Sequence, residues 1–332
     1  MREPHFWKSG LDPKSRESAP LTRALLTPLA FLYRTITAQK IASTTPIKTS
    51  AKVICVGNIT AGGVGKSPIV TALRSRIEAD YGLRTATLSR GYGGSLRGPV
   101  RVDPDKHLAA QVGDEPLMLS QKGESWIGAD RAAAGQQMSA AGVDAVIMDD
   151  GHQNPKLAKD FTFVVIDSEA PFGNGHIIPK GPLREPIVTS LKRADAVIMM
   201  GNGPTPNVVK AQGLPILAAS VSPSGELPCQ PYVAFAGIGR PAKFFDTLAD
   251  IKADVRDSVP FPDHHTYSNT DMDYLHQLAR DRGAKLVTTE KDFARLTPSQ
   301  RADVLTLPIQ VRFDDTALLD KLLSDVLKDT AK

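Results

Sequence analysis

The stretch VICVGNITAGGVGKSPIVTAL, residues 53–73, decides the fold of this chain. It opens with an apolar run rich in β-branched residues, which predicts a short buried strand. A glycine-rich loop follows and leads to Gly65-Lys66-Ser67. Apolar residues at helical spacing then predict a helix that begins at Pro68, where proline is well tolerated. A strand, a glycine loop, Lys-Ser and a helix, in this order, are typical of a phosphate-binding loop.

The chemistry of such a loop assigns its residues. Backbone N–H groups of the glycine turn and the positive helix N-terminus face the phosphates of a nucleotide. We expect Lys66 to reach the β- and γ-phosphates and the Ser67 hydroxyl to bind Mg²⁺. Thr60 stands where the strict motif has its first glycine, so a chance Gly-Lys-Ser is the alternative, but the correct flanks favour the phosphate site. The residues expected to contact the nucleotide here are Thr60, Ala61, Gly62, Gly63, Val64, Gly65, Lys66, Ser67 and Pro68.

Composition narrows the class of protein. The 332 residues are 41% hydrophobic and 23% charged, which suits a globular chain with one large or two smaller domains. A net charge of +4 gives no argument for nucleic-acid binding. Cys55 and Cys229 are the only cysteines, which is too few for a disulfide framework or a zinc site. A reducing cytoplasmic compartment is the natural expectation.

The N-terminal region has an apolar stripe. The first twenty residues are polar and lack the apolar core of a signal peptide. Residues 21–36 are too short and too charged for a confident membrane span. They suit an amphipathic helix in a membrane interface and, equally, a helix packed on the protein's own core. The stripe consists of Leu21, Leu25, Leu29, Leu32 and Ile36, and the candidate membrane anchors are Phe6, Trp7, Arg23, Arg34 and Lys40.

Polar residues follow several predicted strands. Residues 144–148 are mostly apolar and lead into Asp149 and Asp150, the Walker B arrangement that brings a carboxylate to the Mg²⁺ of a phosphate loop. Arg90 directly follows a predicted strand at residues 85–88, where ligands gather in parallel sheets, so we expect it to meet an anionic substrate group. Asp114 and Glu115 precede an apolar run, and there they either charge a helix N-terminus, bind a metal or accept a proton.

The rest of the chain continues to alternate strands and helices. Strands are predicted at 161–167 and 194–200, and the Gly- and Pro-rich loop 171–186 between them is expected to be functional. Residues 204–215 resemble a linker. Further strands are expected at 214–217, 231–236, 285–289 and 307–313, with a last helix at 316–327. The adjacent His264 and His265 are either solvated or, beside Asp263, an oriented base. The alternation predicts parallel sheets with helices on both faces.

Three functional classes remain: a kinase, a GTPase switch and a mechanical ATPase. A GTPase needs Asn-Lys-x-Asp to read its base, and the nearest tetrapeptide is Thr289-Glu290-Lys291-Asp292, with Glu in place of Asn. A kinase also needs an acceptor pocket and a base. The long loops and the Asp-His cluster offer both.

The whole set of motifs resembles the tetraacyldisaccharide 4′-kinase family of lipid A biosynthesis. The resemblance extends from Phe6-Trp7 to about Leu296, and the family's own phosphate loop also lacks the early glycine. It implies ATP-dependent phosphorylation of the 4′-hydroxyl of tetraacyldisaccharide 1-phosphate, which yields lipid IVA. The motifs, in the family's order, are GNITAGGVGKSP, LSRGYGG, GDEPLML, MDDGHQNPKL, PKGPLREP, FAGIGRP, FPDHHTY and TTEKDFARL.

The resemblance also implies an architecture and partners. An α/β domain at 46–212, with a P-loop NTPase-like parallel sheet flanked by helices, and a smaller α/β/α domain at 213–332 would enclose a cleft. A segment at 1–45 would dock by its helix on the cytoplasmic face of the inner membrane. The cofactors would be ATP and Mg²⁺, and the partners a lipid A precursor and the membrane surface, with neither nucleic acid nor an obligate protein partner. The alternative is a P-loop ATPase, or a kinase of another acceptor, with the N-terminal stripe packed inward.

Residue roles follow from the resemblance at matching positions. Lys66 matches the catalytic phosphate-loop lysine, Asp114 the acid proposed as base, and His264 the histidine that pairs with it, although His265 is one residue away. His152 and Asn154 depart from the family pattern. The remaining assignments are Ser67, Asp149, Asp150 and Glu115 near the metal, Glu290, Lys291 and Asp292 near the nucleotide, and Arg90, Arg184, Asn58 and Gln153 on the substrate side.

Overall fold

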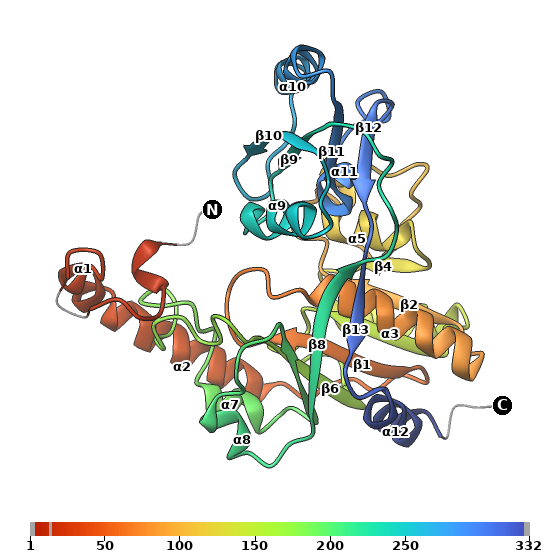
Figure 1. Ribbon diagram of the computed structural model, residues 1–332. Coiled ribbons are helices and arrows are strands. Elements are labelled where there is room, and N and C mark those ends of the chain that lie inside the picture. The colour runs from red at the N-terminus through yellow and green to blue at the C-terminus, as the bar shows by residue number, and fades with distance from the viewer. Residues whose placement is uncertain (1–3, 13–14, 329–332) are drawn as a thin grey trace.

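The computed structural model describes residues 4–12 and 15–328, and it contains two separate β-sheets (Figure 1). The large sheet has nine strands. Six neighbouring pairs are parallel, and only the two edge strands run antiparallel to their neighbours. In spatial order, its strands are β13 (Ile309–Phe313), β8 (Ile216–Pro223), β7 (Ala196–Met200), β6 (Phe161–Asp167), β1 (Lys52–Asn58), β5 (Ala145–Asp149), β2 (Thr85–Ser89), β4 (Ser125–Ile127) and β3 (Val100–Arg101).

The small sheet has four strands, and all of its pairs are parallel. We call the part of the chain built on it the small unit, and the part built on the nine-stranded sheet the large unit. The strands, in spatial order, are β10 (Val255–Pro260), β9 (Tyr232–Ala236), β11 (Lys285–Thr289) and β12 (Val304–Leu307). The helices of the small unit are α9 (Pro241–Asp250), α10 (Asn269–Asp281) and α11 (Glu290–Arg295).

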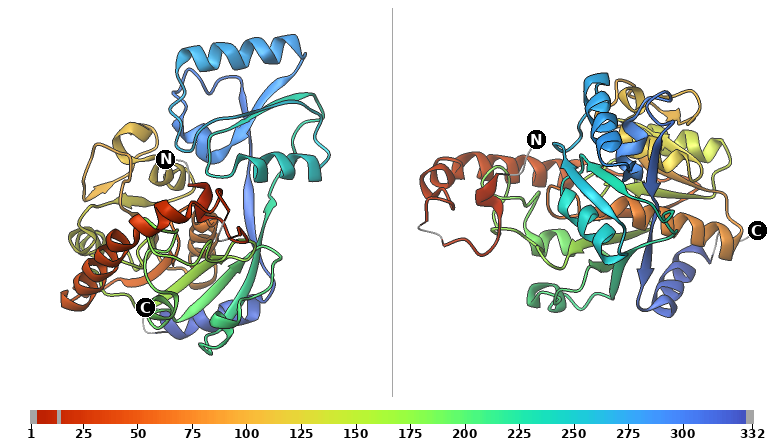
Figure 2. Two further views of the ribbon diagram at one scale, coloured as in Figure 1. Left: turned by 90° about the vertical axis from the view of Figure 1, so that its left-hand side faces the viewer. Right: turned by 45° about the horizontal axis from the view of Figure 1, so that its top comes forward.

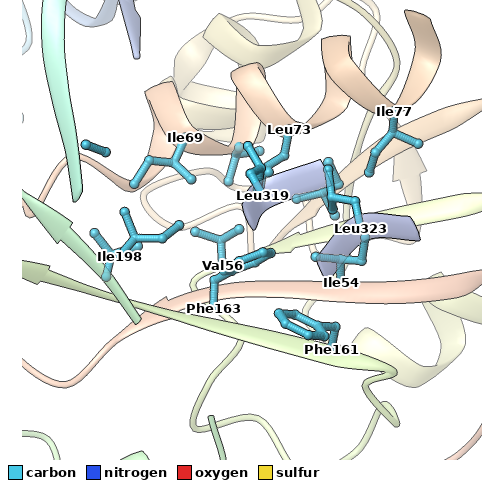
Figure 3. Close-up of a cluster of buried hydrophobic side chains, with 14 of the residues drawn as sticks. Ile54, Val56, Ile69, Leu73, Ile77, Phe161, Phe163, Ile198, Leu319 and Leu323 are labelled. Carbon is cyan, nitrogen blue, oxygen red and sulfur yellow. The ribbon is translucent and has the colours of Figure 1, made fainter. Parts of the chain in front are cut away.

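The large sheet is buried on both faces because successive side chains along its strands point alternately into two apolar layers. Ile54 and Val56 of β1 pack with the helix α3 (Lys66–Tyr81) and with α12 (Thr316–Leu327), as Figure 3 shows. Val53 and Cys55, which point the other way, pack on the opposite side with α6 (Arg131–Ala140). The other helices of the large unit are α4 (Ala109–Val112), α5 (Asp114–Ser120), α7 (Ile187–Leu191) and α8 (Asn207–Lys210).

The expected division at residue 213 does not follow the sheets. β8 pairs with β7, and β13 pairs with β8, so residues 216–223 and 309–327 belong to the large unit. The single strand expected at 307–313 is two strands in different sheets. Pro308 separates them, because a residue without an N–H cannot continue a ladder. The units are therefore joined at 224–231 and at Pro308, where the Ser224 N–H donates to the Pro308 carbonyl (2.9 Å).

The N-terminal region forms a 3₁₀ turn at His5–Trp7 and two helices, α1 (Pro20–Leu25) and α2 (Thr27–Ser43), which extend along one side of the large unit (Figure 2). Within residues 4–12 and 15–328, no helix is long and apolar enough to cross a membrane. The expected stripe is exposed on these helices, with Leu21 at 81% and Ile36 at 56%. Two expected membrane anchors bond instead to the loop 171–186: Trp7 donates to the Pro179 carbonyl (3.0 Å) and Arg23 contacts His176 (2.8 Å).

Candidate active site

The phosphate loop lies between the end of β1 and the start of α3, as expected. Gly62 and Gly65 have φ values of +106° and +83°, a region that glycine enters without a Cβ clash. The helix begins at Lys66 rather than Pro68, which is its third residue. The Lys66 ammonium donates to Asn58 Oδ1 at 3.1 Å and lies 3.4 Å from Asp150 Oδ1. Lys66 is therefore held at the mouth of the loop by groups that a phosphate can replace.

The two Walker B acids differ in environment. Asp149 ends β5 and is 2% exposed, and its Oδ1 has no hydrogen-bond partner among residues 4–12 and 15–328. Burial, together with the nearby Glu115 carboxylate, raises the pKa of Asp149 to about 7. Asp150 accepts a hydrogen bond from Arg184 at 2.7 Å. Burial opposes its ionisation, but Lys66 and Arg184 outweigh burial and hold the pKa of Asp150 well below its usual range.

Residues expected on the substrate side form one network beside the phosphate loop. Gln153 donates to the Asn58 carbonyl (3.0 Å), and Arg184 donates to Gln153 Oε1 (3.2 Å). The loop 171–186 reaches this network because Ala61 donates its N–H to the Pro182 carbonyl (2.7 Å). Arg90, by contrast, is exposed at the end of β2, and no hydrogen bond to it is found among residues 4–12 and 15–328.

A carboxylate and a histidine from different units meet across the gap between the sheets. Asp114, the first residue of α5, is 8% exposed, and its Oδ2 lies 3.0 Å from His264 Nδ1. His264 lies in the loop after β10 and has φ +57°. His265 instead contacts Asp271 (3.1 Å) at the start of α10 and stacks on Phe261. The geometry therefore favours His264 over His265 as the partner of Asp114.

Helix α11 of the small unit packs against α5 and brings two cations to its acids. Lys291 lies 2.9 Å from Glu115, and Arg295 donates to Asp114 Oδ2 at 2.6 and 2.8 Å. Burial alone would raise the pKa of Asp114. The His264 hydrogen bond and the charges of Lys291 and Arg295 outweigh burial and hold that pKa well below its usual range. Asp114 is thus an anion in this structure.

Comparisons with known proteins agree on one family. The family model described as LpxK, tetraacyldisaccharide-1-P 4′-kinase, matches residues 22–328. The chain belongs to this family. The resemblance stated from the motifs is confirmed.

Relatives of the family cover the whole chain. The tetraacyldisaccharide 4′-kinase of Hyphomonas neptunium is 52% identical over 332 residues and covers 100% of both chains. That of Caulobacter vibrioides is 46% identical over 323 residues, which are 94% of this chain and 96% of the relative. The crystal structure of the apo form of LpxK from Aquifex aeolicus in complex with ATP matches with a TM-score of 0.74 and 25% identity. It covers 92% of this chain and 99% of that chain.

Two residues expected near the nucleotide have other partners here. Asp292 is fully buried and accepts hydrogen bonds from Gly237 N–H (3.0 Å) and the Tyr267 hydroxyl (2.9 Å). Glu290 pairs with Lys122 at 2.6 Å. Asp292 and Glu290 thus bond to other residues of the chain in this structure, whereas Lys291, between them in sequence, contacts Glu115.

Sequence reasoning did not single out Arg295, although it contacts both Asp114 and Asp292. A signal was present in the sequence. Lys291 and Arg295 are four residues apart and therefore lie on one helix face. Two cations on one face of a helix beside an expected nucleotide segment indicate anionic partners. What the sequence did not reveal is that these partners are Glu115 and Asp114 of the other unit.

The residues near the phosphate loop fit a magnesium ion. Among the residues that the structure describes, no cluster of three or more His, Cys, Asp or Glu residues could hold a metal alone. Mg²⁺ is commonly bound through one or two carboxylates together with substrate phosphates, so such a cluster is not required. The bare, buried Oδ1 of Asp149 is the kind of atom that a cation satisfies. Ser67, in the first turn of α3, supplies a hydroxyl at the same end of the sheet.

Proposed function

We propose that this chain transfers the γ-phosphoryl group of ATP to the 4′-hydroxyl of tetraacyldisaccharide 1-phosphate. One observation carries the proposal beyond family membership. Helix α5, whose first residues are Asp114 and Glu115, packs against α3, whose first residue is Lys66. The Asp114–His264 pair therefore lies beside the helix that follows the phosphate loop, as a phosphate donor and a hydroxyl acceptor require.

The phosphoryl transfer can be written in full with ATP, the acceptor hydroxyl and the groups of this chain. The acceptor oxygen attacks the γ-phosphorus, a new O–P bond forms, and the bond to the β,γ-bridging oxygen breaks to release ADP. The hydroxyl proton passes to the Asp114–His264 pair, whose members lie 3.0 Å apart. General-base help of this kind contributes about 10²–10⁴-fold. Lys66 exchanges Asn58 and Asp150 for the phosphates, and Arg184 lies beside it to meet the remaining negative charge.

A magnesium ion would be held by Ser67 and Asp149, with Asp150 and Glu115 beside them. When bound, it neutralises charge on the β- and γ-phosphates. The chain itself buries Asp149 away from solvent, and the described residues place no hydrogen-bond donor at its Oδ1. Lys291 holds Glu115 from the small unit at 2.9 Å.

The competing function is a P-loop ATPase, or a kinase of another acceptor, and the family match favours the lipid kinase. The test is transfer of ³²P from γ-labelled ATP to tetraacyldisaccharide 1-phosphate in mixed micelles, beside release of free phosphate. We expect labelled bis-phosphate that requires the lipid, and little phosphate without it. Hydrolysis of ATP that proceeds equally without lipid, with no labelled lipid, would favour the ATPase.

We further propose that α1 and α2 dock on the cytoplasmic face of the inner membrane. The support is the exposure of the apolar stripe, in which Leu32 is 55% exposed, and of the neighbouring Phe31, which is 68% exposed. Apolar side chains of this size, next to basic residues, suit insertion at the boundary between headgroups and acyl chains.

The docking is tested by sedimentation with anionic lipid vesicles. Replacing Phe31 and Leu32 together by Ser should weaken binding about tenfold or more, since burying one such side chain is worth about 1.5–3 kcal/mol. Tyr274→Ser, at an exposed aromatic on α10, is the matched control and should bind like wild type. Equal binding of all three proteins would contradict the docking.

A further inference from the structure

The guanidinium of Arg295 connects the Asp114–His264 pair to the interior of the small unit. Its side chain is 5% exposed, although the residue ends a short helix. Nε and Nη2 donate to Asp114 Oδ2 at 2.8 and 2.6 Å, and Nη1 donates to Asp292 Oδ1 at 2.7 Å and to the Gly237 carbonyl at 2.6 Å. One planar group thus joins an acid of the large unit to an acid of the small unit.

The far end of this connection is rigid. Asp292 is fully buried, and besides Arg295 it accepts from Gly237 N–H, the Tyr267 hydroxyl and Thr289 Oγ1. A Cβ at Gly237 would lie only 3.0 Å from the Tyr267 hydroxyl, so the backbone approaches this network closely. A carboxylate bonded on so many sides cannot turn, and it holds Arg295 at a set distance from β9.

The near end fixes His264 at two points. The Gly237 carbonyl that accepts from Arg295 also accepts the backbone N–H of His264, at 3.1 Å. The Asp114 carboxylate that accepts from Arg295 also contacts His264 Nδ1, at 3.0 Å. Arg295 therefore touches both the group that holds the backbone of His264 and the group that holds its ring. His264 itself has φ +57°, a conformation that needs such support in a residue other than glycine.

We infer that Arg295 is a positioning residue for proton transfer: its fork between Asp114 and the Asp292–Gly237 frame sets the orientation of the His264 ring. This inference rests on the proposed kinase function, because it assigns a task within that reaction. Arg295 also keeps Asp114 anionic, so the carboxylate acts as an acceptor for His264 Nδ1–H. The other ring nitrogen, Nε2, lies 3.8 Å from the Asp263 carboxylate and, without a proton, can meet the acceptor hydroxyl. Lys291, at 3.9 Å, is the second cation beside Asp114.

A pair of substitutions separates charge from geometry at this position. Arg295→Met removes both, and Arg295→Lys keeps a positive charge but cannot form a fork between two carboxylates. The matched control is Arg301→Met. Arg301 also bonds to α11, through the Phe293 (3.1 Å) and Ala294 (3.0 Å) carbonyls, but has no contact with Asp114 or His264.

The first readout is kinetic. We expect Arg295→Met to lower kcat about 10²-fold, the cost of a misplaced catalytic group, and to change KM for ATP less than about threefold. The acid limb of its kcat profile should move to higher pH, because Asp114 loses a cation. Arg295→Lys should return the acid limb to its wild-type pH position but should not restore the value of kcat. Arg301→Met should leave the acid limb where it is in wild type.

The second readout needs no activity. In protein labelled with ¹⁵N-histidine, the His264 ring signals, identified with His264→Gln, should show the single Nδ1–H tautomer in wild type and a mixture in Arg295→Met. If wild type phosphorylates no lipid, the proposed function is wrong, and the tautomer measurement alone then tests the role of Arg295. An unchanged acid limb in an active Arg295→Met enzyme, or an unchanged tautomer in an inactive one, overturns the inference.

Discussion

The phosphate loop and the Asp114–His264 pair are built in opposite ways. Asn58 and Asp149 end two neighbouring strands of one sheet, and Lys66 begins the helix that follows the first of these strands. Asp114 and His264 are 150 residues apart and belong to different units. The first cluster exists wherever the large sheet folds, whereas the second exists only when the small unit is seated on α5.

The two clusters also treat their acids differently. Asp149 is buried, the part of the chain that the structure describes offers no donor to its Oδ1, and its pKa is raised to about 7. Asp114 is nearly as buried but is surrounded by His264, Lys291 and Arg295, and its pKa is lowered. The large unit thus leaves the charge of Asp149 incompletely neutralised, and a metal ion can supply the missing positive charge. The small unit itself supplies the charge for the other acid.

The largest effect should come from the phosphate loop. Lys66→Ala removes the only ammonium that contacts Asn58 and Asp150 among the described residues, and should lower phosphoryl transfer by at least about 10²–10³-fold, as loss of a preorganised charge does. Transfer of ³²P is the measurement. Lys52→Ala, at the other end of β1 beside Asp160, is the control and should stay within about twofold of wild type. Comparable losses in both variants would mean that the loop is not the phosphate site.

A second effect tests the cluster that spans the units. His264→Ala should lower kcat by about 10²-fold, within the range of general-base catalysis, and leave ATP affinity unchanged. His265→Ala is the matched control. Its ring contacts Asp271 and Phe261, so we expect a loss of stability near 1 kcal/mol and a nearly normal kcat. The reverse ranking would assign the proton transfer to His265.

The contrast between the acids predicts stability changes of opposite sign. The folded pKa of Asp149 lies above its unfolded value, so its ionisation destabilises the fold progressively as pH rises from about 4 through 7. In metal-free protein, Asp149→Asn should therefore be more stabilising at pH 8 than at pH 5, by about 2 kcal/mol.

Asp114→Asn is the control for that change. The lowered pKa of Asp114 contributes stability above its ordinary pKa, so its loss should destabilise the protein at both pH values. Urea unfolding of the three proteins at the two pH values measures both effects. An Asp149→Asn variant that is destabilised at pH 8 would contradict the unsatisfied burial of Asp149.

The smallest effect on kcat should come from an ion pair that also joins the units but lies outside the Asp114–His264 pair. Arg240 donates to Asp167 at 2.6 Å, is 40% exposed, and leaves Lys243 beside Asp167 when removed. Arg240→Ala should change kcat less than about threefold and stability by about 1–2 kcal/mol, because Asp167 is buried but Arg240 is partly exposed and Lys243 stays beside the carboxylate. A kcat loss as large as that of His264→Ala would show that the reaction depends on contact between the units in general rather than on the Asp114–His264 pair.

Local patterns predicted much of this molecule. The strand–loop–helix from Val53 to Leu73, the acids that end β5 and the strand at 161–167 follow from runs of apolar residues and their spacing. The two-residue strand β3 and the short β4 carry too few residues for a periodic signal and were not expected. The expected strand at 307–313 spans a change of sheet at Pro308, and the sequence hides this change because the alternation of apolar residues continues across it, at Leu305, Leu307, Ile309, Val311 and Phe313.

The sequence by itself predicted the strand, loop and helix at residues 53–73, the acids that end β5 and the family, because each depends on residues that are close in sequence or on motifs in a set order. Only the tertiary structure decided that Arg295 bonds Asp114, that His264 rather than His265 faces it, and that residues 309–327 return to the large sheet. The physical reason is range. Strand and helix propensities act over a few residues, whereas the charge that sets the state of Asp114 comes from groups 150 to 181 positions away that meet it only when both sheets have folded.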